Sequence, residues 1–505
     1  MGRLKPTLIL GGPGCGKTTA LLKIVEAAFD KGVEPHRVAF VAFTRKAAQE
    51  ARERMVEKFG IEQKAIPYFK TLHSFAFSQL DIGRSQILTD EKLREYAQAE
   101  GLEISPEFTD EFGQVIGQPT TEDERALSAI SLARLTKQPL EDVCVEADLD
   151  YAYTTRIKDD YDEFKADALL VDFTDMIEQF ETAGQIPQFD LLIVDEAQDL
   201  SRAQWLMVDK LVENAKDVYF AGDDDQAIYA WAGADVDYFL NMDAVREVLP
   251  VSYRLKKNVF NACQDVIHLV DDRYEKNWEP HAEGGHIDFV SHLEDLDLST
   301  GSWYLLARTN KLVQRYTRFL QREGYPYFSP TKDGMKSSTS VDPVQAALIY
   351  ENLRQGKRFT GDKLRLVWSW IAAPRRPDIA PVFDEVTEYG IDALTSTGFD
   401  ASDSWLDALS ISGAMQEYIR AMRARGESLT KAPRITCSTI HGVKGGEADN
   451  VVVDQKLTGR TFVSWTNADP QEVRALFTAM SRAKERLIFL EAKSRTTYGI
   501  ERILS

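Results

Sequence analysis

The stretch that decides the fold is Gly11-Gly12-Pro13-Gly14-Cys15-Gly16-Lys17-Thr18, which fits the pattern GxxxxGK[ST]. A short apolar run at residues 7–10 precedes it, and a helical pattern starts near Thr19. Glycines let successive backbone N–H groups converge on phosphate oxygens, and the N-terminus of the following helix adds positive potential. This order of strand, loop and helix predicts a phosphate-binding loop, whereas a chance glycine-rich turn would not need both flanking elements.

Two groups of side chains are expected to complete the nucleotide site. Lys17 would contact the β- and γ-phosphates, and Thr18 would hold Mg²⁺ through its hydroxyl. Residues 189–194 form a buried-strand pattern that ends in Asp195 and Glu196. A carboxylate at this position lies beside the phosphate loop, so Asp195 can hold Mg²⁺ and Glu196 can polarise the attacking water. The residues expected to bind the nucleotide here are Gly11, Gly12, Pro13, Gly14, Cys15, Gly16, Lys17, Thr18 and Thr19.

A third segment, residues 222–234, follows another predicted strand at residues 218–221. The amide of Gln226 can sense the γ-phosphate. Tyr229 and Trp231 are spaced i, i+2 and can present flat faces to bases, a contact worth ~1–3 kcal/mol per base. Taken alone, such a pair is more often part of a hydrophobic core.

Composition restricts the classes of protein that fit. A length of 505 residues predicts about three domains, or two lobes with insertions. The net charge of −20 means that local groups, not the overall field, must hold any polyanion. The four cysteines are far apart, which argues against a disulfide scaffold and a zinc site. With no signal-peptide pattern and no apolar stretch near ~20 residues, we expect a soluble cytoplasmic protein without a membrane partner.

Short apolar runs alternate with helical patterns along most of the chain, which predicts an α/β fold with parallel sheets. The expected strands include residues 7–10, 38–43, 191–194, 218–221, 303–307, 435–439, 451–453 and 487–490. Two mainly helical stretches interrupt this rhythm, and the first carries 21 acidic and 8 basic side chains over residues 86–167. The expected domains are a first lobe at 1–85 and 171–248 with an acidic helical insertion at 86–170, and a second lobe at 249–333 and 434–505 with an insertion at 334–433.

With these motifs in place, the sequence resembles the UvrD/Rep-like branch of superfamily 1 DNA helicases. The resemblance continues in order through segments that match the motifs of that family. These segments are residues 43–48, 71–75, 195–199, 222–234, 252–254, 307–310, 438–447 and 474–483.

The resemblance implies two RecA-like P-loop lobes with ATP and Mg²⁺ in the cleft between them. It implies that Lys17, Asp195, Glu196 and Gln226 act in catalysis, with Arg254 and Arg482 as arginine fingers from the second lobe. It further implies that Tyr253 stacks on adenine and that Glu447 binds ribose. The residues that it places along single-stranded DNA are Phe43, Thr44, Thr71, His73, Tyr229, Trp231, Arg308, Asn310, Thr439, His441 and Lys444.

The function implied is an ATP-dependent helicase and translocase that moves 3′→5′ on single-stranded DNA and acts at single-strand/duplex junctions. The setting would be DNA repair or replication in a bacterial or phage-infected cell. A 5′→3′ RecD-like helicase, a nucleotide-switched DNA-binding protein and an RNA motor remain alternatives. The sequence departs from the family at three places: no upstream adenine-reading glutamine segment is recognisable, Ala230 and Ala232 flank Trp231 where arginine is common, and Gly446 replaces a usual leucine.

Overall fold

The chain forms two compact units. The computed structural model describes residues 5–105, 119–331 and 334–504. The first unit comprises Met1–Ile287, Thr458–Glu485 and Tyr498–Ser505, and the second comprises Asp288–Leu457 and Arg486–Thr497. The segment Thr458–Glu485 therefore packs with the N-terminal part of the chain, although it follows the second unit in sequence. The predicted boundaries of lobes and insertions stay a prediction.

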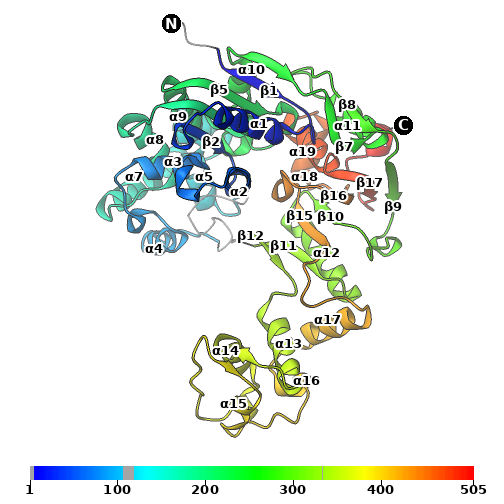
Figure 1. Ribbon diagram of the computed structural model, residues 1–505. Coiled ribbons are helices and arrows are strands. Elements are labelled where there is room, and N and C mark those ends of the chain that lie inside the picture. The colour runs from blue at the N-terminus through cyan, green and yellow to red at the C-terminus, as the bar shows by residue number, and fades with distance from the viewer. Residues whose placement is uncertain (1–4, 106–118, 332–333, 505) are drawn as a thin grey trace. The chain divides into compact units, whose positions relative to one another are not determined.

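The first unit is built on a six-stranded sheet with strand order β3-β2-β4-β5-β1-β6 (Figure 1). Every pairing in it is parallel. Its strands are β1 (Thr7–Leu10), β2 (Val38–Ala42), β3 (Phe69–Thr71), β4 (Phe189–Val194), β5 (Ala215–Gly222) and β6 (Val245–Val248). Strand β5 separates β1, which leads into the phosphate loop, from β4, which leads into Asp195. The structure confirms the predicted strands of this lobe, with ends that differ by a few residues.

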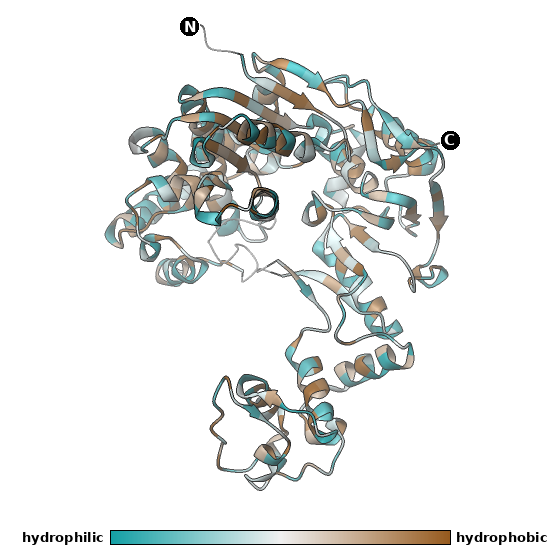
Figure 2. Ribbon diagram, viewed as in Figure 1, coloured by the Kyte–Doolittle hydropathy of each residue, from teal (hydrophilic) through white to brown (hydrophobic). Residues whose placement is uncertain are grey.

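Both faces of this sheet are covered. Ile9 points into one hydrophobic core while its neighbours Leu8 and Leu10 point into another, as the two-residue period of a strand requires. Helices α1 and α2 pack on the first core, and α3, α8 and α9 on the second. This double burial explains why β2 is apolar at every position and why β1 and β4 end in consecutive apolar residues (Figure 2). The helices are α1 (Lys17–Asp30), α2 (Arg45–Phe59), α3 (Leu72–Gln79), α8 (Phe173–Ala183), α9 (Arg202–Glu213), α10 (Val236–Asn241) and α11 (Lys257–Ile267).

The described parts of the acidic stretch are mainly helical. They contain α4 (Asp90–Glu100), α5 (Glu122–Thr136), α6 (Leu140–Glu146) and α7 (Tyr151–Asp167). Two cations of these helices form ion pairs with the start of α8: Arg134 contacts Asp172 at 3.0 Å, and Lys165 contacts Asp172 at 2.7 Å and Asp175 at 2.8 Å. Although burial opposes ionisation, Arg134 and Lys165 lower the pKa of Asp172 to about 2. These ion pairs connect the acidic helices to the start of α8.

The second unit contains a seven-stranded sheet with strand order β12-β11-β15-β10-β16-β17-β9. Strand β10 pairs in parallel with β15 and with β16, whereas β11 and β12 form an antiparallel pair. The strands are β9 (His286–Val290), β10 (Trp303–Ala307), β11 (Tyr327–Thr331), β12 (Gly334–Ser337), β15 (Ile435–Thr439), β16 (Ala448–Asp454) and β17 (Ala483–Leu490). The predicted strands of this lobe are also confirmed.

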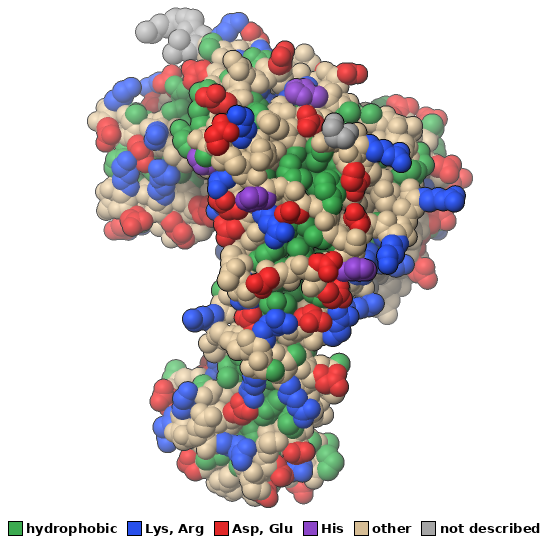
Figure 3. Space-filling model, turned by 90° about the vertical axis from the view of Figure 1, so that its right-hand side faces the viewer, with side chains coloured by type: hydrophobic (Ala, Val, Ile, Leu, Met, Phe, Trp, Pro, Cys, Tyr) green, Lys and Arg blue, Asp and Glu red, His purple; other side chains and the backbone are tan. Residues whose placement is uncertain are grey.

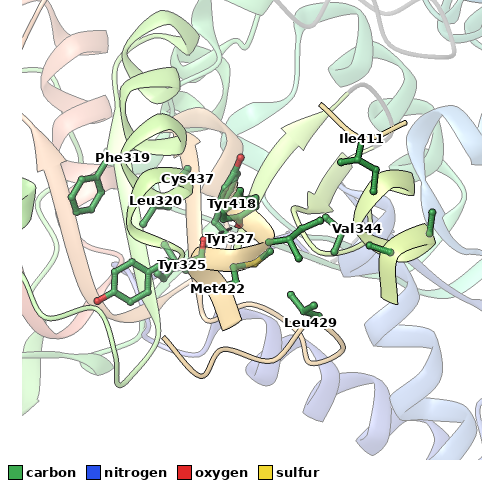
Figure 4. Close-up of a cluster of buried hydrophobic side chains, with 14 of the residues drawn as sticks. Phe319, Leu320, Tyr325, Tyr327, Val344, Ile411, Tyr418, Met422, Leu429 and Cys437 are labelled. Carbon is green, nitrogen blue, oxygen red and sulfur yellow. Dashed lines mark hydrogen bonds between the residues drawn. The ribbon is translucent and has the colours of Figure 1, made fainter. Parts of the chain in front are cut away.

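The helices of the second unit pack on one continuous hydrophobic core. Figure 4 shows part of it, where Tyr327 and Tyr418 lie side by side near Cys437 of the sheet. The hydroxyl of Tyr418 donates to the backbone oxygen of Tyr325 at 2.8 Å, which satisfies its buried polar end. The helices are α12 (Asn310–Glu323), α13 (Asp342–Arg354), α14 (Gly361–Trp370), α15 (Asp392–Thr395), α16 (Trp405–Ala408) and α17 (Gly413–Ala424), with a short β13–β14 pair (Phe359–Thr360 and Glu388–Tyr389).

The C-terminal part of the first unit adds α18 (Gly459–Thr466) and α19 (Pro470–Met480). Helix α19 is buried from Glu472 to Met480 and packs against α11 and against the turn Asp224–Gln226. Strands β7 (Val251–Lys256) and β8 (Glu279–Ala282) form a parallel pair. In the sequence, β7 directly precedes α11 and β8 follows it. These contacts bring residues from the end of the chain to the nucleotide motifs near its beginning.

The surface is charged but mixed. Figure 3 shows acidic and basic side chains interspersed over the face that it draws, so the net charge is not gathered into one patch there. Across the parts of the chain that the structure describes, no helix combines the length and the apolar character needed to cross a bilayer.

Candidate nucleotide and nucleic-acid site

The phosphate loop connects β1 to α1, which begins at Lys17, two residues earlier than predicted. Gly14 and Gly16 have φ values of 75° and 78°, a left-handed conformation that glycine adopts without a Cβ penalty. A Cβ at Gly14 would collide with the Cβ of Arg254. Lys17 is 8% exposed, and its ammonium donates to the carbonyl of Gly11 at 2.7 Å. The loop therefore holds its lysine folded across itself, where phosphate oxygens would compete for the same ammonium.

The other loop residues have distinct surroundings. The thiol of Cys15 is buried, and burial raises its pKa to about 12, so it stays protonated. The carbonyl of Pro13 accepts a 2.7 Å hydrogen bond from the hydroxyl of Ser252. Thr19 is exposed on the first turn of α1. The carbonyl of Gly14 accepts a hydrogen bond from the backbone N–H of Tyr253 at 2.9 Å. Strand β7 is thus hydrogen-bonded directly to the phosphate loop.

Thr18 and Asp195 meet at the expected metal position. The hydroxyl of Thr18 donates to Oδ2 of Asp195 at 2.8 Å. Burial, with a contribution from Glu196, raises the pKa of Asp195 to about 6, although the hydrogen bond from Thr18 and the charge of Lys17 act in the opposite direction. A hydroxyl and a buried carboxylate are hard oxygen donors, the type that Mg²⁺ prefers. The residues present therefore fit a magnesium ion.

Glu196 lies next to this pair in a strained backbone conformation. Its φ of 55° and ψ of 41° place a non-glycine residue in the left-handed region. Such strain is commonly found where a side chain has to be held in a functional orientation. Its carboxylate accepts a 2.6 Å hydrogen bond from the amide of Gln198, whose oxygen accepts from the N–H of Asp223 at 3.1 Å. The predicted catalytic carboxylate is therefore linked to the segment that carries Gln226.

Gln226 bridges a carboxylate and an arginine. Its Nε2 donates to Oδ2 of Asp223 at 2.6 Å, and its Oε1 accepts from the guanidinium of Arg482. Arg482 is 1% exposed and also donates to the carbonyl of Thr478 at 3.0 Å. Arg254 lies beside the same group, since its Nη1 donates to the carbonyl of Ser481 at 3.3 Å. Within the first unit, the fold therefore brings Arg254 to the phosphate loop and Arg482 to Gln226.

The aromatic residues predicted to contact DNA form a row that starts from the same loop. The rings of Phe43 and Tyr229 are stacked, with centroids 5.4 Å apart and planes inclined by 30°. The ring of Trp231 is 6.3 Å from that of Tyr229 and is 44% exposed. Burial raises the pKa of Tyr229, so its hydroxyl stays neutral. The exposed face of Trp231 is the part of this row that a base can reach.

Three further predicted DNA contacts lie at helix starts. The hydroxyls of Thr44 and Thr71 accept hydrogen bonds from the N–H groups of Ala47 and Ser74, which makes both threonines N-caps. His73 packs edge-on against Phe173 with ring centroids 5.0 Å apart. Burial, assisted by Arg45, lowers the pKa of His73 to about 4, so the imidazole is neutral at pH 7. Each of these side chains thus has a structural partner besides any DNA contact.

The remaining predicted residues lie in the second unit, at the two opposite ends of its parallel strands. Arg308 and Asn310 follow β10, and Thr439 ends β15 directly opposite Ala307. His441 lies in the short turn that follows β15. Strands β15 and β16 are both parallel to β10, so the connection between them, which carries Lys444, returns from the carboxyl end of β15 to the amino end of β16, where Glu447 lies. The expected ribose ligand is therefore separated from the DNA-contact residues Arg308, Asn310 and Thr439 by the length of a strand.

Comparisons with known proteins match this arrangement. The model for the UvrD/REP helicase N-terminal domain matches residues 3–245, and that for the UvrD-like helicase C-terminal domain matches residues 434–490. The chain belongs to the UvrD/Rep-like family of superfamily 1 helicases. Its α/β architecture of two RecA-like lobes, with a parallel sheet in the first unit and a mixed sheet in the second, agrees with this assignment.

Curated relatives of this UvrD/Rep-like chain include proteins named ATP-dependent DNA helicase PcrA. The PcrA of Leuconostoc citreum is 25% identical over 85% of this chain and 58% of its own length. That of Staphylococcus aureus is 27% identical over 58% of this chain and 42% of its own length. The chain thus spans about half the length of these relatives. Among solved structures, an arterivirus helicase, nonstructural protein 10, aligns with a TM-score of 0.34 and 10% identity, covering 99% of this chain and 62% of its own.

The structure accounts for a glycine at position 446. A Cβ at this position would collide with the hydroxyl of Tyr304. The tyrosine on β10 therefore occupies the space that a side chain at position 446 would need.

Sequence reasoning missed a group of cations beside Gln226. Lys276 is completely buried and contacts carboxylate oxygens of Asp223 at 3.0 Å, Asp224 at 2.5 Å and Asp225 at 2.9 Å. Arg273 contacts Asp225 at 2.6 Å. The signal was present in the sequence, because three consecutive aspartates inside a buried motif require nearby cations. No spacing rule indicated which lysine, about 50 residues further on, would supply one.

Proposed function

We propose that this UvrD/Rep-like chain is an ATP-driven motor that moves 3′→5′ on single-stranded DNA and separates the strands at a junction with duplex. The observation that carries the proposal is the short loop after β5. This loop begins after Gly222, whose carbonyl accepts a hydrogen bond from the N–H of Gly11 in the phosphate loop at 3.4 Å. Gln226 in the loop accepts a hydrogen bond from Arg482, and three residues later Tyr229 stacks on Phe43. A change at the nucleotide is thereby adjacent to a surface that can bind bases.

On the nucleotide side, ATP would draw the ammonium of Lys17 away from the carbonyl of Gly11 and onto its phosphates. Thr18 and Asp195 would hold Mg²⁺, which neutralises phosphate charge when bound. Glu196 would orient the attacking water. Arg254 and Arg482 would stabilise the charge on the transferring phosphoryl group, the role of an arginine finger. Tyr253, which is 71% exposed, would stack on the base, and Glu447 would bind the ribose.

On the DNA side, Trp231 and the rings behind it would stack on bases, while the predicted polar residues would contact the backbone. Arg308, Asn310, Thr439, His441 and Lys444 would act from the second unit, and Thr44, Thr71 and His73 from the first. Closure around ATP would shift the two sets along the strand, and hydrolysis would release them. The direction of movement is proposed from the likeness to the UvrD/Rep family.

The test is ATP turnover with and without single-stranded DNA, followed by displacement of streptavidin from 3′- or 5′-biotinylated strands and unwinding of tailed duplexes. DNA should raise turnover many-fold, and the protein should clear the 5′ end. Lys17→Ala should abolish turnover, whereas Lys23→Ala, on the exposed side of the same helix, should not. Clearing the 3′ end would identify a RecD-like direction. ATP-dependent DNA affinity without displacement would identify a nucleotide-switched binding protein, and equal stimulation by ribose strands an RNA motor.

A further inference from the structure

The segment between β7 and the second unit supplies two cations, Arg273 and Lys276, to a buried ionic cluster, and both lie outside the family-model matches at residues 3–245 and 434–490. Lys276 lies at its centre, and its ammonium is shared by three carboxylates at 2.5–3.0 Å. The three carboxylates lie within 4.8 Å of one another and are at most 1% exposed. We call Asp223, Asp224, Asp225, Arg273 and Lys276 the aspartate cluster.

Charge balance makes Lys276 the central member of the aspartate cluster. Buried carboxylates this close repel one another strongly unless cations lie between them. Arg273 forms an ion pair with Asp225, whereas the positive charge closest to Asp223 and to Asp224 is that of Lys276. Although burial opposes its charged form, the carboxylates raise the pKa of Lys276, so it stays protonated. Without this ammonium, Asp223 would lose its nearest compensating charge.

Asp223 in turn decides how Gln226 is oriented. A carboxylate can only accept hydrogen bonds, so it selects the NH₂ end of the amide. The opposite end, Oε1, must then face Arg482, which can only donate. If Asp223 were protonated or displaced, the amide could turn and direct its NH₂ group at the guanidinium. The hydrogen bond between Arg482 and Gln226 therefore depends on a chain of contacts that runs from Lys276 through Asp223 to Gln226.

The same segment is attached to the phosphate loop by a second route. The ring of Trp278 lies against Gly12, where an added Cβ would be 2.5 Å from its Cη2 atom. His281 contacts the carbonyl of Ser252 at 3.1 Å through Nδ1, and Ser252 is bonded to Pro13. Residues 273–281 therefore contact both the phosphate loop and the turn Asp224–Gln226.

We propose that Lys276 is a positioning residue for ATP hydrolysis, which holds Gln226 and Arg482 in their working orientation through Asp223. This inference rests on the proposed function, because it assigns a role in the same nucleotide site. It predicts that Lys276 affects turnover through Gln226 and has little effect on nucleotide binding.

The test is a double-mutant cycle on steady-state ATP turnover. Lys276→Met should lower kcat by about 10-fold or more and change the KM for ATP by less than about threefold. In a Gln226→Ala background the same substitution should cost little more, because the chain is already broken. Lys257→Met is the matched control: this lysine pairs with Glu283 at the surface and should leave turnover unchanged. Equal losses in both backgrounds, or no loss in kcat, would overturn the proposal.

Two further measurements keep the result decisive. If thermal melting shows that Lys276→Met does not fold, Asp223→Asn tests the same chain with lysine retained, because its amide can offer Gln226 either a donor or an acceptor. An unchanged kcat for Asp223→Asn would contradict the role of Lys276. Turnover without DNA tests Lys276, and the ratio of turnover with and without DNA tests the motor, so that either proposal can fail alone.

Discussion

Thr18 and Asp195 are 177 positions apart in the sequence, yet the hydroxyl of one donates to the carboxylate of the other at 2.8 Å. Strands β1 and β4 lie on either side of β5, and their carboxyl ends bring both residues to one edge of the sheet. Burial and the neighbouring carboxylate of Glu196 raise the pKa of Asp195. This pair is where we expect magnesium to bind.

Asp195→Asn should therefore reduce ATP turnover by about 100-fold or more, because several kcal/mol of charge stabilisation by the metal would be lost. Titration with Mg²⁺ should show a weaker requirement or none. Asp209→Asn is a suitable control, because Asp209 accepts a hydrogen bond from Tyr238 away from the loop. Full turnover by Asp195→Asn would remove this residue from the metal site.

Arg482→Ala should retain nucleotide binding and lose about 10³-fold in turnover, which is the scale of a missing arginine finger. The guanidinium is buried beside Gln226, so melting must be measured together with turnover. Arg460→Ala, on the exposed side of α18, should behave as wild type. A loss of only two- or threefold, in a folded variant, would show that Arg482 is not catalytic.

Trp231→Ala should weaken binding of single-stranded DNA by about 1–3 kcal/mol and leave turnover without DNA nearly unchanged. The ring is 44% exposed, so its removal should cost the fold little. Fluorescence anisotropy with a labelled oligonucleotide gives the affinity. Tyr151, which is 46% exposed on α7, offers the matched aromatic control. Equal affinities of Trp231→Ala and wild type would place the ring outside the DNA path.

Gly12→Ala should abolish nucleotide binding, because the new methyl group would collide with the ring of Trp278. Equilibrium binding of ADP is the appropriate measurement. In the double variant Gly12→Ala with Trp278→Leu, the smaller side chain should restore part of the affinity. If the second substitution restores nothing, the requirement for glycine comes from the bound phosphates and not from Trp278.

His73 should make the protein sensitive to acid. Its pKa is lowered to about 4, so the unfolded chain binds a proton at higher pH than the folded one, and stability falls as the pH drops from about 6.5 to 4. The effect should reach about 3 kcal/mol at most. Arg45 and Asp172 are the charged groups that act on this ring. Melting of wild type and His73→Gln across this range should converge at low pH, and parallel curves would exclude the effect.

The sequence by itself determined the architecture and the nucleotide motifs. The apolar runs at residues 38–43 and 451–453 favoured strands buried on both faces, because such short segments without polar positions have no solvent-facing side. The glycine spacing around Lys17 predicted its loop equally directly, since few other residues permit backbone N–H groups to converge. The roles in catalysis and DNA contact remain predictions from motif order.

Only the tertiary structure decided which distant residues meet. The packing of α19 against the turn Asp224–Gln226 brings Arg482 to Gln226 within the first unit. Lys276 belongs to no recognised motif, and its place among three aspartates depends on how the chain returns from α11 to β8. Periodicity and motif spacing describe residues that are neighbours along the chain. A buried carboxylate instead needs a cation close to it in the folded interior, and the fold can supply that cation from any part of the sequence.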